Sequence, residues 1–295
     1  MRAAWMPAAA ALLALAAPAA AAPGGSADRQ AAARAAAWLR TVSGVAPGQQ
    51  ADAIVALAAA GAGRPVLGPR LSRLVALAPA YASTAGAAGK VALAAEAAGA
   101  DPRRLRGVDY LARIRGAYAA GRYGATGFDQ ALAMLALAGA GERVPAAAVA
   151  ALRSDRGAGG WGNDLTPSGR DDVSTTAILI EALRAAGVRA RDPMLRAAAA
   201  WMTAQANGQG GYAFFGARGV TEANSTALAI RALRALGRTP PPASRAALRG
   251  LQLPDGSIAF TAASPGSPLI ATVDALVALS GTTLPPRTGA AAPGA

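Results

Sequence analysis

The chain is 295 residues long, contains neither cysteine nor histidine, and carries a formal net charge of +13. The absence of cysteine excludes disulfides, and the absence of both residue types excludes the common zinc sites. Because 53% of the residues are hydrophobic but only 4% are aromatic, we expect a single domain with a core of alanine and leucine.

The first 22 residues have the pattern of a secretory signal peptide. One charge, Arg2, precedes an Ala-Leu run over residues 8–17, and Pro18 is followed by small residues up to Ala22. We predict cleavage after Ala22 and a mature protein that is secreted, periplasmic or held at the cell envelope. The leucine-rich part is too short to span a bilayer, so no stable membrane insertion is expected after cleavage.

Six short apolar helices, each followed by a glycine, are predicted along the rest of the chain. A glycine after the last apolar residue is a common helix stop, because it adopts the left-handed conformation without strain. The segments are apolar almost all round, which predicts helices that are buried on most faces. These predicted inner helices span residues 50–60, 90–98, 128–138, 176–186, 226–236 and 270–280.

Amphipathic segments lie between the predicted inner helices. Arginine alternates with Ala, Leu and Trp in residues 28–41, 103–114, 192–205 and 242–251, which predicts an outer layer with one charged face. Six inner and six outer helices in alternation predict an all-α fold, an (α/α)6 toroid of six helix-hairpin repeats over residues 23–283. An open superhelix of helix pairs is the structural alternative. Residues 284–295, rich in Pro, Gly and Ala, are predicted to form a disordered tail.

A short phrase recurs where two successive inner helices begin. Ser174-Thr175-Thr176-Ala177 returns as Asn224-Ser225-Thr226-Ala227, each time after a Gly-Gly-aromatic turn. The inner helices of a toroid point their N-termini at its mouth, so polar residues there, backed by unpaired backbone N–H groups, are candidates for ligand contacts. Ordinary helix capping is the other interpretation of this pattern. The candidate ligand-binding residues are Trp161, Asp171, Asp172, Thr175, Tyr212, Glu222, Asn224 and Phe260.

The sequence offers few groups for catalysis. Without histidine, acid–base chemistry near neutral pH needs a carboxyl group with a raised pKa, a tyrosine or Lys90, the only lysine. Asp171 and Asp172 are the best carboxyl pair, but neighbours at a helix start point in different directions, so we predict no catalytic residue and no metal ligand. Asp52 and Asp274 are weaker counterparts of the polar residues at the helix starts.

The positive charge does not indicate nucleic acid as a partner. The arginines are scattered over the predicted outer helices, and no basic cluster alternates with aromatic residues as a nucleic-acid surface would. We therefore expect no binding of nucleic acid.

The repeats resemble those of the terpene cyclase and prenyltransferase superfamily. The family motif is an aromatic-Leu pair, a glutamine, a short turn with Asp or Asn, and Gly-Gly-aromatic. Its closest matches are Trp201-Met202, Gln205, Asn207 and Gly210-Gly211-Tyr212, then residues 252–257. The resemblance implies the toroid fold and an isoprenoid ligand. The Asp-x-Asp-Asp acid of the cyclases has only Asp171-Asp172 as a counterpart, and the Cys and His zinc ligands of protein prenyltransferases have none.

The chain is also similar to the secreted cobalamin carriers of the transcobalamin and intrinsic factor group, in Asn224-Ser225-Thr226-Ala227 and in its predicted export. The resemblance implies a toroid that holds a corrinoid without chemistry, although we find no counterpart of the carriers' second, sandwich-like domain. We therefore expect an exported, non-catalytic toroid that binds a corrinoid or isoprenoid at its loop-bearing end, with no cofactor identified. The alternatives are a terpenoid cyclase- or prenyltransferase-like enzyme, a carbohydrate-active enzyme, or a scaffold for a protein partner.

Overall fold

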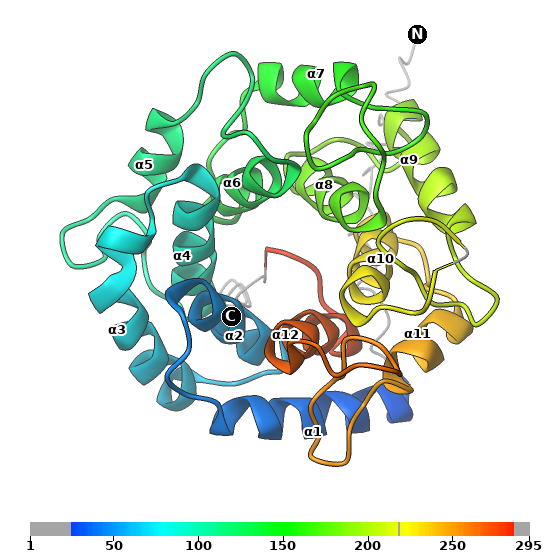
Figure 1. Ribbon diagram of the computed structural model, residues 1–295. Helices are drawn as coiled ribbons and strands as arrows, with labels where there is room; N and C mark the ends of the chain where they lie inside the picture. Colours follow the sequence, from blue (N-terminus) through cyan, green and yellow to red (C-terminus); the bar gives the residue numbers. More distant parts are fainter. Residues whose placement is uncertain (1–24, 218, 286–295) are drawn as a thin grey trace, which may run out of the picture.

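The computed structural model describes residues 25–217 and 219–285, which form a ring of two concentric layers of helices (Figure 1). The inner layer consists of α2 (Pro47–Ala59), α4 (Ala85–Ala97), α6 (Gly127–Gly139), α8 (Val173–Ala185), α10 (Ala223–Ala235) and α12 (Pro268–Leu279). The outer layer consists of α1 (Ser26–Thr41), α3 (Arg64–Tyr81), α5 (Tyr110–Gly116), α7 (Ala146–Ser154), α9 (Pro193–Ala204) and α11 (Pro242–Arg249). The predicted (α/α)6 toroid is thereby confirmed. The predicted signal peptide and residues 286–295 of the predicted tail lie outside the described residues.

The last repeat packs against the first and closes the ring. Each inner helix packs against the next inner helix, and α12 packs against α2, while α1 lies across α11 and α12. In α1, the buried carboxylate of Asp28 accepts hydrogen bonds from Arg249 and, at 2.8 Å, from Arg245 of α11. The Gln252 side chain also donates to the Ala31 carbonyl at 2.9 Å. The open superhelix is therefore excluded.

The inner helices begin one to five residues earlier than predicted; α4 starts at Ala85, for example, and α8 at Val173. The reason is that polar caps precede the apolar runs. Thr84, Thr126 and Asp172 each accept the backbone N–H of the third residue that follows, at 3.1, 3.0 and 2.7 Å. The predicted glycine stops are confirmed for five of the inner helices, as at Gly61, where φ is +82°. The predicted stop at Gly139 is wrong, because α6 includes this residue and the glycine in the left-handed conformation is Gly141, with φ of 76°.

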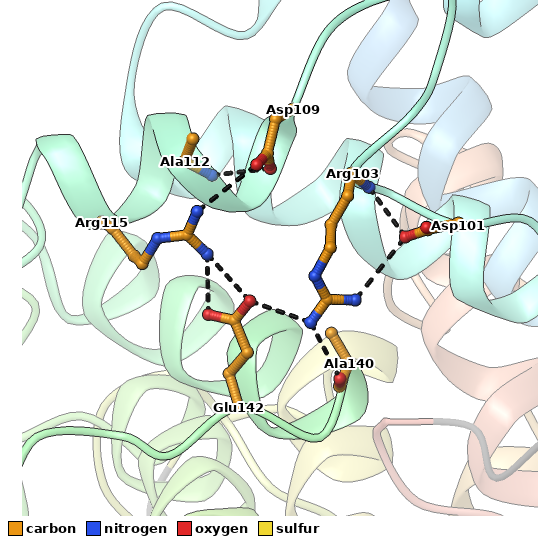
Figure 2. A network of polar contacts seen from close by, with 7 residues as sticks. All are labelled: Asp101, Arg103, Asp109, Ala112, Arg115, Ala140 and Glu142. Carbon is orange, nitrogen blue, oxygen red and sulfur yellow. Dashed lines mark hydrogen bonds and ion pairs between the residues drawn. The ribbon is translucent and has the colours of Figure 1, made fainter.

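The predicted outer helix over residues 103–114 is wrong in its first half, since α5 spans only Tyr110–Gly116. Residues 103–108 instead form a tight turn, in which Arg106 and Gly107 have φ of 47° and 80°. Arg103 leaves this turn to donate to Glu142 at 2.9 Å, and Arg115 of α5 donates to the same carboxylate at 2.8 Å (Figure 2). These contacts of Glu142 thus connect α5 and the turn before it to the loop that follows α6.

The two ends of the ring differ in their connections. Long loops over residues 155–172, 205–222 and 250–267 precede α8, α10 and α12, so they lie where the inner helices begin. We call this the loop end and the opposite end the tail end. At the tail end, the chain that follows α12 turns back toward the centre of the ring (Figure 1). In the described part of the chain, no helix is both long and apolar enough to cross a membrane.

Candidate functional site

The recurring threonine of the repeat phrase anchors the loop of its own repeat. In three successive repeats, its hydroxyl oxygen accepts a backbone N–H from the residue that follows the turn. The pairs are Trp161 with Thr176 at 2.9 Å, Tyr212 with Thr226 at 3.0 Å, and Ile258 with Thr272 at 2.9 Å. Loop anchoring therefore accounts for this part of the repeat.

The first N–H group of each of three inner helices is paired, so the expectation of a free donor there is wrong for these groups. Each first N–H donates to a carbonyl in the loop of the next repeat. The pairs are Gly127 with Asn163 at 2.8 Å, Val173 with Phe214 at 3.0 Å, and Ala223 with Phe260 at 2.8 Å. Each loop thus covers the helix start of the preceding repeat, which binds neighbouring repeats together.

The aromatic candidates pack inside these loops. Trp161 and Tyr212 are fully buried, and the Trp161 indole N–H donates to the Leu152 carbonyl at 2.7 Å. Phe260 is half-buried, and its carbonyl accepts the N–H at the start of α10. The fully buried Thr175 lies against Gly127, where an added Cβ would come within 2.4 Å of its methyl carbon. These side chains pack loop against helix.

The two adjacent aspartates have separate partners. One carboxylate oxygen of Asp171 accepts the N–H groups of Gly159 and Gly160, at 3.0 and 2.9 Å. Asp172 is buried and caps α8 by accepting the Thr175 N–H, and burial raises the pKa of its carboxyl to about 6. The pair therefore shapes the loop, as the capping interpretation expects.

Of the eight candidates, Asn224 connects the mouth to the interior of the ring. Glu222 stays within its loop, where its carboxylate accepts the Phe214 N–H at 3.0 Å and the Ser225 hydroxyl at 3.1 Å. The Asn224 amide instead donates to Asp274 of α12 at 2.7 Å. Asp274 lines the central cavity, which is described below. Asn224 therefore contacts a residue of this cavity, which is a different place from the predicted site at the mouth. Whether any of the eight residues binds a ligand stays a prediction.

Five of the six inner helices contribute a charged side chain to ion pairs in the ring interior. Following the ring, these are Glu181 of α8, Arg231 of α10, Asp274 of α12, Asp52 of α2 and Lys90 of α4. Four of them, without Glu181, line a small central cavity. Its apolar walls are Val55, Leu93, Leu132, Val273, Val277 and Leu284. The cavity is therefore amphipathic.

The charges around the cavity form two ion-paired groups. Lys90 Nζ donates to Asp52 Oδ2 at 2.6 Å, and both side chains keep more than a quarter of their surface exposed. Arg231 donates to Glu181 Oε2 at 2.6 Å and to Asp274 Oδ1 at 3.4 Å, and the Arg231 and Glu181 side chains are only 2% and 0% exposed. Three carboxyl groups thus face two cations.

Asp274 is a cavity carboxyl group with a raised pKa. Burial raises its pKa, and the negative charge of Asp52 raises it further, while Arg231 and Asn224 act in the opposite direction. The cavity therefore places a carboxyl group with a raised pKa beside apolar walls.

A second buried carboxyl group lies at the tail end. Within residues 25–217 and 219–285, both carboxyl oxygens of Glu96 are buried without a hydrogen-bond partner, and burial raises the pKa of this group to about 8. The carboxyl lies against Gly139 of α6, at a point that Pro285 also approaches. Near neutral pH, Glu96 is therefore mainly uncharged.

The interior charges carried a signal that the sequence interpretation did not use. Glu181 and Arg231 are the ninth residues of α8 and α10, inside segments that are otherwise almost wholly apolar. A charge in such a helix must be paired or must serve a site, because an isolated buried charge is strongly unfavourable. Asp52, Lys90 and Asp274 were considered only as weaker candidates or as a general base.

Solved structures of type II terpene cyclases have the same fold. Superposition on the apo form of the cyclase MstE from Scytonema gives a TM-score of 0.62 at 17% identity, over 86% of this chain and 98% of the cyclase. A variant of MstE in complex with its substrate, geranylgeranyl dihydroxybenzoate, gives 0.60 at 18% identity, over 86% and 97%. No family model matches the sequence. No curated protein matches it either. The likeness to terpene cyclases is therefore one of fold.

Proposed function

We propose that this chain is a terpenoid cyclase-like enzyme that takes an isoprenoid chain into its central cavity and starts cyclisation with a proton from Asp274. The observation that carries the proposal is the cavity itself, where apolar walls enclose a carboxyl group whose pKa is raised. The fold supports it, because a type II terpene cyclase of this fold has been solved with a geranylgeranyl substrate.

The surroundings of Asp274 suit a proton donor in two respects. Burial and Asp52 favour the protonated form before the reaction. After transfer, the Asn224 amide at 2.7 Å and the Arg231 guanidinium at 3.4 Å stabilise the carboxylate that is left. The proton forms a new C–H bond at one carbon of a double bond and leaves a carbocation. A proton lost after ring closure makes the product an isomer of the substrate.

This proposal reverses the order of the two functions expected from the sequence. The non-catalytic carrier was the first expectation, but the solved structures named above are terpene cyclases, which favours the alternative. None of these is a corrinoid carrier, so a corrinoid is not part of the proposal. Export stays a prediction, and N-terminal sequencing of the protein from its natural source would test it. Pro23 as the first residue would support signal-peptide cleavage, and Met1 would contradict it.

The test uses geranylgeraniol and a geranylgeranyl-substituted benzoate as substrates. Mass spectrometry and NMR should find products of unchanged mass with fewer double bonds. Asp274→Asn removes the proton at almost constant shape, so turnover should fall by about 100-fold or more while the substrate still binds. Asp101→Asn is the matched control, because this carboxyl lies on the outer surface with its side chain 48% exposed.

Three outcomes would change the proposal. Equal turnover in the wild type and Asp274→Asn would remove Asp274 from the reaction. Saturable isoprenoid binding without any cyclised product would leave a carrier, as the sequence analysis first expected. If neither compound binds, the isoprenoid assignment itself is wrong.

A further inference from the structure

The chain after α12 doubles back into the tail end of the ring (Figure 1). The Thr282 hydroxyl donates to the Val277 carbonyl at 3.3 Å, and the Leu284 N–H donates to Glu181 Oε1 at 3.1 Å. The Leu284 side chain lines the central cavity, and Pro285 reaches the end of α6 at Gly139. We call residues 280–285 the strap.

The strap occupies space that a long ligand would need. With Leu284 in place, the centres of water molecules reach only about 50 Å³ of the cavity. That is room for a few waters, since one water needs about 10 to 15 Å³ on this measure. Drug-sized ligands occupy pockets of about 300 Å³ or more. A twenty-carbon chain therefore does not fit beside the strap.

The strap is the most weakly attached wall of the cavity. The other lining residues belong to inner helices, each held by its own backbone ladder and by two neighbouring helices. Beyond its bonds to the end of α12, the strap has the Leu284 N–H bond to Glu181, one partly buried leucine and the approach of Pro285 to Gly139. Segments with few buried contacts open at a lower free energy than core helices. We therefore expect the strap to open at a lower free energy than the other walls of the cavity.

The carboxyl group of Glu96 also favours a movable strap. Its two oxygens have no hydrogen-bond partner in the described part of the chain, at the point where Pro285 approaches Gly139. If Pro285 moves away, water can form hydrogen bonds with this buried carboxyl group. The free energy gained in this way offsets part of the free energy that is lost when the contacts of the strap break. The closed state therefore contains an unsatisfied group that the open state can satisfy.

We infer that the strap is an internal stopper, which closes the tail end of the empty ring and is displaced when a ligand fills the cavity. The inference rests on the proposed function only for the class of ligand. Because closed molecules cannot bind, the apparent affinity is reduced by the fraction of chains that are closed. Loss of the strap should therefore strengthen binding.

The first experiment compares three chains for their affinity toward geranylgeraniol. One runs to Ala295, one ends at Thr283 and lacks the contacts of Leu284 and Pro285, and the matched control ends at Pro285 and keeps them. We expect the chain that ends at Thr283 to bind about tenfold more tightly or better, and the control to match the chain that runs to Ala295. Equal or weaker binding by the chain that ends at Thr283 would overturn the inference, because the strap would then be a fixed wall.

The second experiment needs no knowledge of the ligand. The natural chain has no cysteine, so Pro285→Cys introduces a single thiol on the strap and Ala150→Cys a single thiol on the exposed face of α7. A thiol reagent should label residue 285 more slowly than residue 150 in the empty protein. Geranylgeraniol should accelerate labelling at 285 alone.

The two experiments separate the inference from the proposed function. If geranylgeraniol binds none of the three chains, the isoprenoid assignment fails, and slow labelling at residue 285 still supports a closed strap. Labelling at 285 as fast as at 150 in the empty protein would overturn the strap. So would bound geranylgeraniol that leaves the rate at 285 unchanged.

Discussion

Two networks of arginine and carboxylate groups illustrate how surroundings change the meaning of the same chemistry. On the outer surface, Glu142 lies between Arg103 and Arg115, whose side chains are 39% and 47% exposed (Figure 2). In the ring interior, Arg231 lies between Glu181 and Asp274 and is 2% exposed. Water screens the first network, so its charges need not balance. The second is largely removed from water, so an unpaired charge there is unfavourable, and burial raises the pKa of Asp274.

The largest effect should come from breaking the interior network. Arg231→Met leaves Glu181 buried without its cation, and we expect the free energy of unfolding to fall by about 3 to 5 kcal/mol. Urea denaturation measures this directly. The control is the double variant Arg231→Met with Glu181→Met, which removes both buried charges and should recover most of the loss. A double variant as unstable as the single one would contradict this account.

Because of Glu96, the free energy of unfolding should differ between two pH values. Its pKa is about 8 in the folded chain and 4.5 for an ordinary glutamate, so the folded state holds the proton more tightly. Stability is therefore full below pH 4.5 and is lost as pH rises toward about 8, by about 3 to 5 kcal/mol. Urea denaturation at pH 5 and pH 8.5 should show the loss.

Glu96→Gln cannot ionise, so most of this pH dependence should vanish in that variant. Asp172, whose pKa burial raises to about 6, should leave a smaller decline in the same direction at lower pH. An unchanged decline between pH 6 and pH 8.5 in Glu96→Gln would show that another group is responsible.

The smallest effect should come from the surface network. Glu142→Gln removes a carboxylate that accepts from two exposed arginines, and we expect a loss of less than about 1 kcal/mol. The difference should shrink further in 0.5 M salt, since exposed charges are screened. A loss as large as that of Arg231→Met would mean that exposure does not separate the two networks.

The fold could be predicted from the sequence because its signals are local. Apolar segments that end at glycines, such as the one before Gly187, and the recurring Thr176 and Thr226 each report on one repeat. The site could not be predicted in the same way. The closure of the ring decides which face of an inner helix points toward the ring axis. In the sequence, Glu181 and Arg231 are therefore isolated charges in apolar helices, and only the structure shows that they form an ion pair.

The polar phrase is compatible with ligand contacts as well as with capping, because the start of an isolated helix offers free N–H groups. In the ring, the loop of the next repeat occupies those groups, as Phe214 does for Val173. The strap lay beyond sequence reasoning for a related reason. Nothing in Leu284-Pro285 itself indicates that it folds back upon Glu181, a residue 103 positions earlier.

The junction at Asp28 has a consequence for how the chain folds. Five of the contacts between neighbouring inner helices join repeats that follow each other, whereas Asp28 and Arg245 meet across 217 positions of sequence. Bringing together the ends of so long a loop is entropically unfavourable until the intervening repeats have formed. We expect α1 and α11 to meet late in folding and to separate early in unfolding. The contact between these two helices should therefore strongly influence the rate at which the whole toroid unfolds.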